Sequence, residues 1–357
     1  MMFSKPCKFL LVILPILGCA LCVQAATHAK TSPAKKKTAA PAAAAPAKKT
    51  ANTISRDPYY SAVVIDSSTG QILQEDHASA AAYPASMVKL MNFFIIFDDV
   101  KAGKLLLDEP VTVTREVSQI GGRQVWLKEG EVFPFEELVY AMMIHSANDA
   151  AAALAIRVSG SRDAHVARMN EKARGLGLRN TVFHSVHGLP PGQGQELDKS
   201  SALDMALMAK ALLAAHPEIL KYTCIPTRTF RETNPVQLTS SNKLLGNLSG
   251  CDGLKTGYFY EAGFSITAAA EREGRRVIAV VMGSKDKNVR DAKAAELIEK
   301  GFARLPPPPV VETNQLPEVV VAEPVVEKQH SILLPVLIGS AALIGAVILL
   351  VRRRKKM

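Results

Sequence analysis

Three short polar clusters decide how the chain folds and what it does: Ser86-Met87-Val88-Lys89, Ser146-Ala147-Asn148 and Lys255-Thr256-Gly257. In this order they supply a serine with a lysine one helical turn away, a hydroxyl beside an amide, and a lysine–threonine pair suited to an anion. Each cluster alone is common in a chain of 357 residues. Their combination predicts a fold that brings three distant segments to one site.

The first cluster lies at the start of a helix that is predicted to run from Ser86 to about Gly103. Lys89 follows Ser86 by three residues, so both side chains project from the same helical face. The positive end of a helix favours an oxyanion. A lysine among apolar neighbours can lose its proton and act as the base for a serine nucleophile. The alternative is that Ser86 only caps the helix and Lys89 extends to the surface.

The other two clusters could act on the same substrate. Ser146 and Asn148 lie at a predicted break between helices, where Ser146 could pass a proton to a leaving amine and Asn148 could hold an amide carbonyl. A helix cap by Asn148 or Asp149 is the alternative. The cluster Lys255-Thr256-Gly257 could bind an anionic terminus, with its glycine allowing a close approach of the substrate backbone, or it could form an ordinary turn.

A change in the period of the hydrophobic residues along the chain, from helical to strand-like, predicts an α/β fold. Ser61–Asp66 and Gln71–Glu75 are expected to form a β-hairpin. After a helical block, residues 263–270 and 275–282 are expected to be strands, and residues 289–302 a final helix. This order predicts an antiparallel sheet flanked by helices, with a mostly helical insertion. The helices expected within the block span residues 136–144, 150–158, 162–176 and 201–215.

The beginning of the chain differs in composition from the body. Residues 1–25, with Lys5 and Lys8 before an apolar run, are typical of an export signal, although lipoprotein processing at Cys19 is an alternative. Residues 26–54 are rich in Ala, Lys, Pro and Thr and contain too few large apolar side chains for a core. We therefore expect a signal peptide followed by a linker.

The end of the chain is typical of a membrane anchor. Residues 305–330 form a Pro/Val-rich linker, and residues 331–351 carry no charge and would span roughly 30 Å as a helix. The basic residues 352–357 that follow predict a cytoplasmic tail. The body at residues 55–304 would then lie outside the cytoplasm, in a periplasm or a cell wall.

Charge, cysteines and histidines narrow the function further. The net charge is +10, but residues 51–304 carry equal numbers of basic and acidic side chains, which argues against a nucleic-acid partner. Cys224 and Cys251 are the cysteines beyond the export signal, and either a disulfide or two free thiols would fit. His184 and His187 lack the spacing and the glutamate of a zinc protease helix, so we expect no metal site.

At these residues the chain resembles the serine D-alanyl-D-alanine carboxypeptidases, the low-molecular-mass penicillin-binding proteins. The resemblance spans about residues 57–303 and implies a β-lactamase/transpeptidase-like fold. Besides the three clusters, the matching segments are Gly121-Gly122-Arg123, Asp149-Ala150-Ala151, Met169–Ala173, Leu176-Gly177-Leu178, His187-Gly188-Leu189 and Asp252-Gly253-Leu254.

The resemblance implies an acyl-enzyme mechanism without a cofactor. Ser86 would attack the bond between the last two D-alanines of a peptidoglycan stem peptide, with Lys89 as base. Ser146 would protonate the departing D-alanine, and the backbone amides of Ser86 and Tyr258 would form the oxyanion hole. β-Lactam antibiotics would then be covalent inhibitors.

The resemblance also assigns substrate binding to Asn148 and to the cluster Lys255-Thr256-Gly257, which would hold the terminal carboxylate. Relatives commonly carry a threonine two places after this glycine, where the chain has Phe259. Many relatives also carry a β-rich domain after the catalytic one, where the chain has the Pro/Val-rich linker. The first departure predicts a difference in carboxylate recognition. The anchor differs as well, because residues 331–351 predict a spanning helix rather than the interfacial amphipathic helix of relatives.

Three other functions compete with the carboxypeptidase. A class A β-lactamase would need a glutamate to activate water, but no acidic residue lies between Asn180 and Gly194, and the middle cluster is Ser-Ala-Asn rather than Ser-Asp-Asn. A D,D-endopeptidase that cuts cross-links, and a non-catalytic wall-binding or β-lactam-sensing module, remain alternatives.

Overall fold

The computed structural model describes residues 53–190, 192 and 196–306. The predicted signal peptide, nearly all of the linker at 26–54, the linker after residue 306, the membrane helix at 331–351 and the basic tail lie outside the described residues. Within the described ranges, no helix combines the length and the apolar character needed to cross a bilayer.

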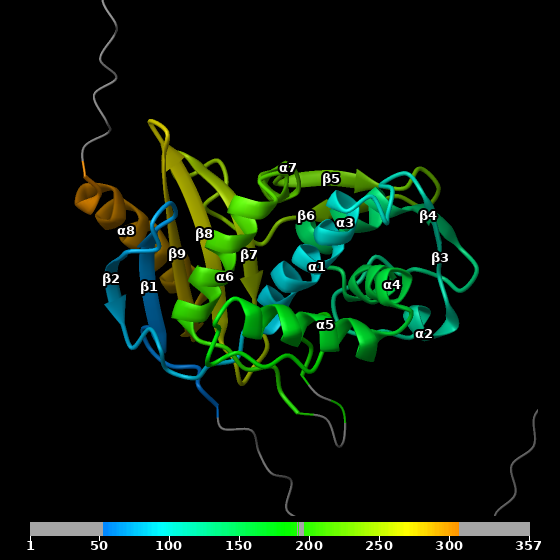
Figure 1. Cartoon of the computed structure of the whole chain (residues 1–357), viewed down its shortest axis with the longest axis horizontal. Helices are drawn as coiled ribbons and strands as arrows, with labels where there is room; N and C mark the ends of the chain where they lie inside the picture. Colours follow the sequence, from blue (N-terminus) through cyan, green and yellow to red (C-terminus); the bar gives the residue numbers. More distant parts are fainter. Residues whose placement is uncertain (1–52, 191, 193–195, 307–357) are drawn as a thin grey trace, which may run out of the picture. The chain divides into compact units, whose positions relative to one another are not determined.

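The central element is a five-stranded antiparallel sheet in the order β2-β1-β9-β8-β7 (Figure 1). Strand β7 therefore forms one edge of this sheet, and β8 is its hydrogen-bonded neighbour within the sheet. The strands are β1 (Ser61–Asp66), β2 (Ile72–Asp76), β7 (Cys251–Gly257), β8 (Phe264–Arg272) and β9 (Arg275–Ser284), and two small sheets pair β3 (Pro110–Thr112) with β4 (Val132–Pro134) and β5 (Thr227–Phe230) with β6 (Val236–Thr239).

Helices cover both faces of this sheet. Figure 1 shows α8 on one face and α6 on the other, and both helices contact β1 and β9. The helical block continues from the α6 side (Figure 1). The helices are the 3-10 helix η1 (Ala85–Val88), α1 (Lys89–Lys101), α2 (Arg115–Ser118), α3 (Phe135–Ile144), α4 (Asn148–Ser159), α5 (Arg162–Gly175), α6 (Ala202–Ala215), α7 (Ile219–Thr223) and α8 (Lys287–Arg304).

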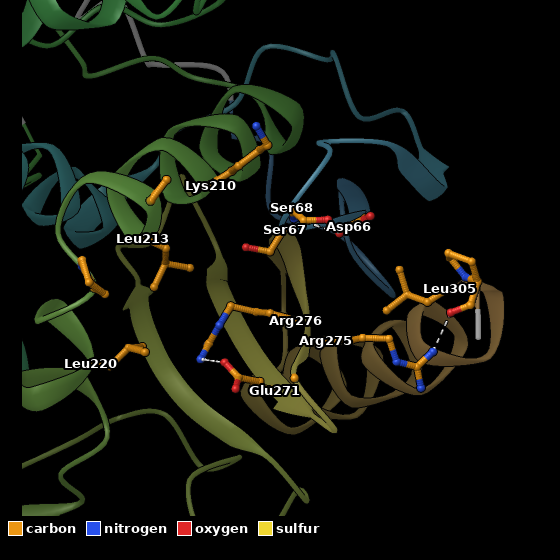
Figure 2. A pocket seen from close by; sticks show the side chains of 14 residues that line it. Asp66, Ser67, Ser68, Lys210, Leu213, Leu220, Glu271, Arg275, Arg276 and Leu305 are labelled. Atoms are coloured by element: carbon orange, nitrogen blue, oxygen red, sulfur yellow. Dashed lines mark hydrogen bonds and ion pairs between the residues drawn. The ribbon is translucent and has the colours of Figure 1, made fainter. Parts of the chain in front are cut away.

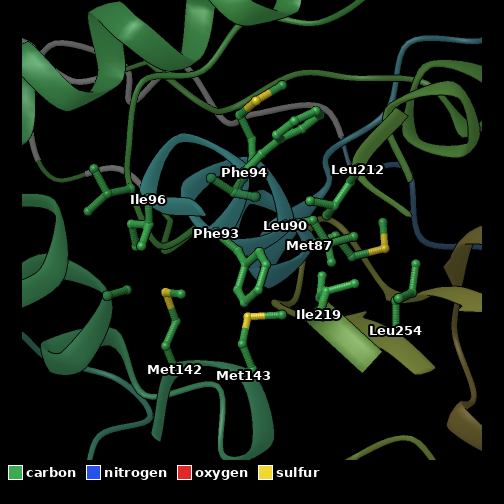
Figure 3. Close-up of a cluster of buried hydrophobic side chains, with 14 of the residues drawn as sticks. Met87, Leu90, Phe93, Phe94, Ile96, Met142, Met143, Leu212, Ile219 and Leu254 are labelled. Atoms are coloured by element: carbon green, nitrogen blue, oxygen red, sulfur yellow. The ribbon is translucent and has the colours of Figure 1, made fainter. Parts of the chain in front are cut away.

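Helix α1 lies at the centre of the larger hydrophobic core. Its sequence is apolar on nearly every side, which is typical of a helix that is buried all round. Figure 3 shows Met87, Leu90 and Phe93 surrounded by side chains of α3, α6, α7 and β7. The rings of Phe93 and Phe97 stack with centroids 3.9 Å apart. Truncating such a buried aromatic ring to alanine typically costs about 3–5 kcal/mol, so α1 is a rigid base for the residues at its start.

The structure confirms the predicted hairpin, the later strands and the helices to within a few residues. The prediction for the start of the first helix was wrong: η1 precedes it, and the α-helix begins at Lys89. Neither Ser86 nor Asn148 caps a helix with its side chain, because the N-cap positions fall on other residues. Cys224 and Cys251 are free thiols.

Candidate active site

The three polar clusters meet in one cleft of about 690 Å³. Ser86 comes from η1, Ser146 from the segment just before α4, and Asn148 from the first residue of α4. Thr256 and Gly257 come from the end of β7. Lys89 and Lys255 lie behind this surface, fully or almost fully buried. The structure thus brings together the residues that the sequence placed in one site.

The amine of Lys89 is held by three oxygen atoms. Its Nζ lies 3.1 Å from Ser86 Oγ, 2.7 Å from Asn148 Oδ1 and 2.6 Å from the carbonyl oxygen of His187. Burial holds the pKa of Lys89 well below its usual range, and the nearby charge of Lys255 lowers this pKa further. The neutral amine is therefore easier to reach at Lys89 than at a lysine in water.

The partners of Lys89 determine where a neutral amine would direct its lone pair. The Asn148 side-chain oxygen and the His187 carbonyl only accept hydrogen bonds, whereas the Ser86 hydroxyl can also donate one. A neutral amine has two N–H groups, which these two acceptors would use. Its lone pair is then left for the Ser86 hydroxyl, and this is the arrangement needed to take a proton from that serine.

Ser146, which lines the cleft, and Ala85, which precedes the cleft residue Ser86, have backbone conformations that are uncommon for non-glycine residues. Ala85, directly before the serine of η1, has φ of 48°, and Ser146 has φ of 64°. Such left-handed conformations cluster at functional sites, where the surrounding structure holds them. Ser146 lines the cleft, and its hydroxyl makes no hydrogen bond to any described residue, so it can interact with a substrate.

Lys255 lies on β7 with its Nζ 3.0 Å from the carbonyl oxygen of Thr256. Burial lowers the pKa of Lys255 to about 7, and the charges of Arg123 and Arg290 act in the same direction. An anion bound beside Lys255 would raise the pKa of this lysine and so favour its charged form. The hydroxyl of Thr256, which also lines the cleft, can donate to the same anion.

Two glycines permit a close approach to the backbone before Ser86. A Cβ atom on Gly257 would lie 2.5 Å from the carbonyl oxygen of Pro84 and 3.2 Å from the amide nitrogen of Ser86. A Cβ atom on Gly188, which has φ of 79°, would lie 2.0 Å from the carbonyl oxygen of Ala85. The strand end and the loop at 188 therefore hold the serine from two directions.

Aromatic side chains continue from the end of β7. Tyr258 is 52% exposed and stacks on Phe264 with ring centroids 4.1 Å apart. Phe259, two places after Gly257, is buried beside Tyr83. It brings no hydroxyl to the cleft, so the donors for a substrate carboxylate have to come from elsewhere.

Sequence reasoning missed three contributions to this site. The carbonyl of His187 holds Lys89, the charge of Arg123 acts on Lys255, and the carboxylate of Asp149 accepts the backbone amides of Val125 and Leu127. The hydrogen bonds to Asp149 hold the segment that directly follows Arg123. All three residues lie in segments that resemble the family. A backbone carbonyl, or a carboxylate behind the cleft, has no sequence pattern of its own that would predict its role.

A second hollow lies at the other end of β8 and β9, next to the turn that joins them (Figure 2). Figure 2 shows Arg276 of this hollow paired with Glu271, at 2.6 Å, and Lys210 reaching from α6. None of the three clusters contributes to it. No group of three or more His, Cys, Asp or Glu residues able to hold a metal ion occurs among residues 53–190, 192 and 196–306.

Comparison with known proteins agrees with this geometry. The family described as D-alanyl-D-alanine carboxypeptidase matches residues 48–286. The chain is 35% identical over 257 residues to D-alanyl-D-alanine carboxypeptidase DacF of Bacillus subtilis, a match that covers 71% of the chain and 65% of that protein. It is 34% identical over 246 residues to DacA of Escherichia coli, covering 67% of the chain and 60% of that protein. The chain thus spans less than two thirds of the length of these relatives.

Solved structures give the same result. D-alanyl-D-alanine carboxypeptidase DacD from Francisella tularensis matches with a TM-score of 0.65 and 26% identity, covering 70% of the chain and 71% of that structure. Penicillin-binding protein D2 from Listeria monocytogenes, solved in an ampicillin-bound form, matches with a TM-score of 0.62 and 33% identity, covering 68% and 97%. These likenesses confirm the predicted fold class, and the chain belongs to the D-alanyl-D-alanine carboxypeptidase family.

Proposed function

We propose that the protein is a serine D-alanyl-D-alanine carboxypeptidase, which removes the terminal D-alanine from peptidoglycan stem peptides through an acyl-enzyme on Ser86. One observation carries this proposal. The buried amine of Lys89 lies 3.1 Å from Ser86 Oγ, and its two other partners only accept hydrogen bonds. This arrangement supports a serine that is activated by a neutral lysine.

Acylation begins when Lys89 accepts the proton of Ser86 and the serine oxygen attacks the carbonyl carbon of the D-Ala–D-Ala bond. The backbone amides of Ser86 and Tyr258 stabilise the oxyanion. Ser146 passes a proton to the departing amine, and its free hydroxyl in the cleft supports this role. The C–N bond breaks, and D-alanine leaves as a free amino acid.

Substrate is held on both sides of the scissile bond. Lys255 and Thr256 bind the terminal carboxylate, and Gly257 lets the substrate backbone approach β7. Asn148 holds an amide carbonyl of the substrate through its side-chain nitrogen, one hydrogen of which already bonds the carbonyl of Gly121 at 3.1 Å. Water then attacks the ester on Ser86 and releases the shortened peptide. β-Lactams acylate the same serine and act as covalent inhibitors.

The test of this proposal is the variant Ser86→Ala. We expect loss of D-Ala-D-Ala hydrolysis and of covalent labelling by a fluorescent penicillin, because the nucleophile is absent. Ser67→Ala, in the hollow at the other end of β8 and β9, is the matched control and should keep both activities. Circular dichroism should show an unchanged fold. Labelling of Ser86→Ala at another residue would overturn the assignment.

We further propose that residues 1–25 are an export signal, that 26–54 and 305–330 are linkers, and that residues 331–351 anchor the protein in the membrane with 352–357 in the cytoplasm. The uncharged segment followed by five basic residues supports this topology. Protease added outside intact cells, or outside spheroplasts if an outer membrane is present, should digest the body. A protected body with a digested tail would reverse this topology.

A further inference from the structure

The cleft has more positive charge than a single carboxylate requires. Its lining includes Arg123, Lys243, Lys287 and Arg290, and Lys255 lies directly behind. None of the described residues that line it is aspartate or glutamate. A departing D-alanine brings one carboxylate, for which Lys255 and Thr256 already suffice in the proposed mechanism.

These cations lie around one short segment. Arg123 donates from Nη1 to Ser241 Oγ at 2.7 Å, and Arg290 donates from Nη2 to the carbonyl oxygen of Ser241 at 3.4 Å. Lys243 follows two residues later in the same segment. Lys287 lies one turn before Arg290 on α8, which places both on one side of that helix. The surplus charge is therefore concentrated in one part of the cleft.

Two acidic residues near this part of the cleft are engaged away from Lys243 and Lys287, and one of them offsets the charge of Arg290. Asp291 pairs with Arg290 at 2.7 Å, and the side chain of Asp286 accepts the amides of Asn288 and Val289 at the start of α8. Lys243 and Lys287 are exposed, and neither forms an ion pair with any residue in the described ranges. Both lysines are free to meet an anion from a ligand.

The surplus lies at the carboxylate end of the cleft. Arg123 and Arg290 are the two charges that lower the pKa of Lys255, so they are close to the lysine that would hold the terminal carboxylate. Lys243 and Lys287 in turn act on Asp291, the partner of Arg290. An anion bound there would belong to the part of the substrate that departs.

We propose that Lys243 and Lys287 form a second anion-binding subsite, which accepts a carboxylate on the departing part of the substrate. The inference rests on the proposed function and names its substrate class. A leaving group that is itself a peptide carries further carboxylates, as in a cross-linked pair of stem peptides, whereas free D-alanine does not. The bond that breaks is still the amide bond at the carbonyl carbon of the D-alanine that acylates Ser86. Water then hydrolyses the ester on Ser86, as in the proposed mechanism.

Three synthetic peptides of the form diacetyl-L-Lys-D-Ala-X separate this second charge from size. X is D-alanine, D-glutamate or D-glutamine, and the last two are nearly isosteric. At low salt we expect kcat/KM for the D-glutamate peptide to exceed that for the D-glutamine peptide about three- to ten-fold, which is the scale of one or two exposed ion pairs. The ratio should fall towards one at high salt, because exposed charges are screened.

The variant that tests the subsite is Lys243→Gln combined with Lys287→Gln, and Lys285→Gln is its matched control. Lys285 is exposed and lies near Lys287 in the chain, but it does not line the cleft. The double variant should bring the D-glutamate to D-glutamine ratio close to one, whereas the control should keep the ratio of the native protein. The double variant should also hydrolyse purified cross-linked muropeptide dimers more slowly than the native protein does.

The outcomes distinguish this inference from the proposed function. Absence of any D-Ala-D-Ala hydrolysis by the native protein would overturn the carboxypeptidase itself. Hydrolysis with equal rates for the D-glutamate and D-glutamine peptides would overturn only the second subsite. A preference for D-glutamate that survives in the double variant would also overturn it, because the charge would then be recognised elsewhere.

Discussion

At the scale of single residues, the site contains two buried lysines whose pKa values are lowered for different uses. Lys89 has hydrogen-bond acceptors around it and lies against Ser86. Lys255 lies among cations, and its pKa is lowered to about 7. In the proposed mechanism Lys89 acts when neutral and Lys255 when charged, so the two lysines set opposite limits on the pH range of activity.

The first prediction concerns pH. For a peptide with a free carboxylate, kcat/KM should fall as pH rises through about 7, because Lys255 loses the charge that holds the substrate. At lower pH the rate should fall again, as Lys89 gains a proton and stops acting as a base. His145 and His187 stay neutral over this range, since burial lowers their pKa values to about 4 and 3. A pH–rate profile on a D-Ala-D-Ala peptide measures both limits.

The variant Arg123→Gln tests whether the alkaline limit belongs to Lys255. Loss of the neighbouring positive charge should raise the pKa of Lys255 and move the alkaline limit to higher pH. The control is a peptide that ends in a carboxamide, for which the alkaline limit from Lys255 should disappear. An alkaline limit that stays in place in Arg123→Gln, or that persists with the carboxamide, would contradict the role of Lys255.

Sequence analysis identified the side chains of this site but not all of its backbone. Ser86, Lys89, Ser146 and Lys255 could be predicted because their side chains form motifs with recognisable order and chemistry. The carbonyl of His187 could not, because every residue has a carbonyl and only the fold brings this one to within 2.6 Å of Lys89.

At the scale of elements, the position of Ser86 depends on how closely the neighbouring strand and loop approach its backbone. The 3-10 helix η1 replaces the first turn of the predicted helix, and periodicity cannot distinguish the two because a single turn is too short to show its period. The end of β7 and the loop at Gly188 contact the backbone next to this turn. Space requires glycine at both contacts, and at Gly188 the left-handed backbone requires it as well.

The second prediction is that Gly188→Ala is more damaging than an ordinary glycine substitution. Its Cβ would lie 2.0 Å from the carbonyl oxygen of Ala85, so the backbone before Ser86 has to move. We expect a loss of about 2–4 kcal/mol in the free energy of unfolding and at least a ten-fold slower acylation by penicillin. Urea unfolding and stopped-flow acylation measure the two effects.

Gly177→Ala is the matched control for this prediction. Gly177 has φ of 72°, close to that of Gly188, but a Cβ atom there would meet nothing within 4 Å. The control should cost only about 1 kcal/mol, from the left-handed backbone alone. Equal losses in the two variants would show that the close contact with Ala85 does not constrain the serine.

At the scale of the whole molecule, the described residues place no carboxylate in the cleft for the step that would follow acylation. Asp198 is the first buried acidic residue after the loop at 188. Its carboxylate accepts the backbone amides of His184 and Ser185 and the Ser185 hydroxyl. No acidic residue among the described ones lines the cleft. A carboxylate that activates water in the manner of a class A β-lactamase is therefore not in place there.

The third prediction concerns the lifetime of the penicilloyl-enzyme. After peptide acylation D-alanine diffuses away and leaves a path for water, but the opened ring of penicillin stays attached. Without a carboxylate base, which typically contributes about 10²–10⁴-fold in rate, the adduct should last minutes or longer. Intact-mass spectrometry after mixing with benzylpenicillin measures this lifetime. Rapid multiple turnover would favour a β-lactamase instead.

The hydrogen bonds of Lys89 also determine when the protein becomes reactive. Two of its partners lie 59 and 98 residues further along the chain, so the amine is held only after the helical block and the following loop have closed around it. In an unfolded chain the same lysine is solvated and protonated, and the same serine is an ordinary alcohol. If the proposed mechanism holds, the nascent polypeptide should therefore stay unreactive towards peptides and antibiotics until these segments have folded.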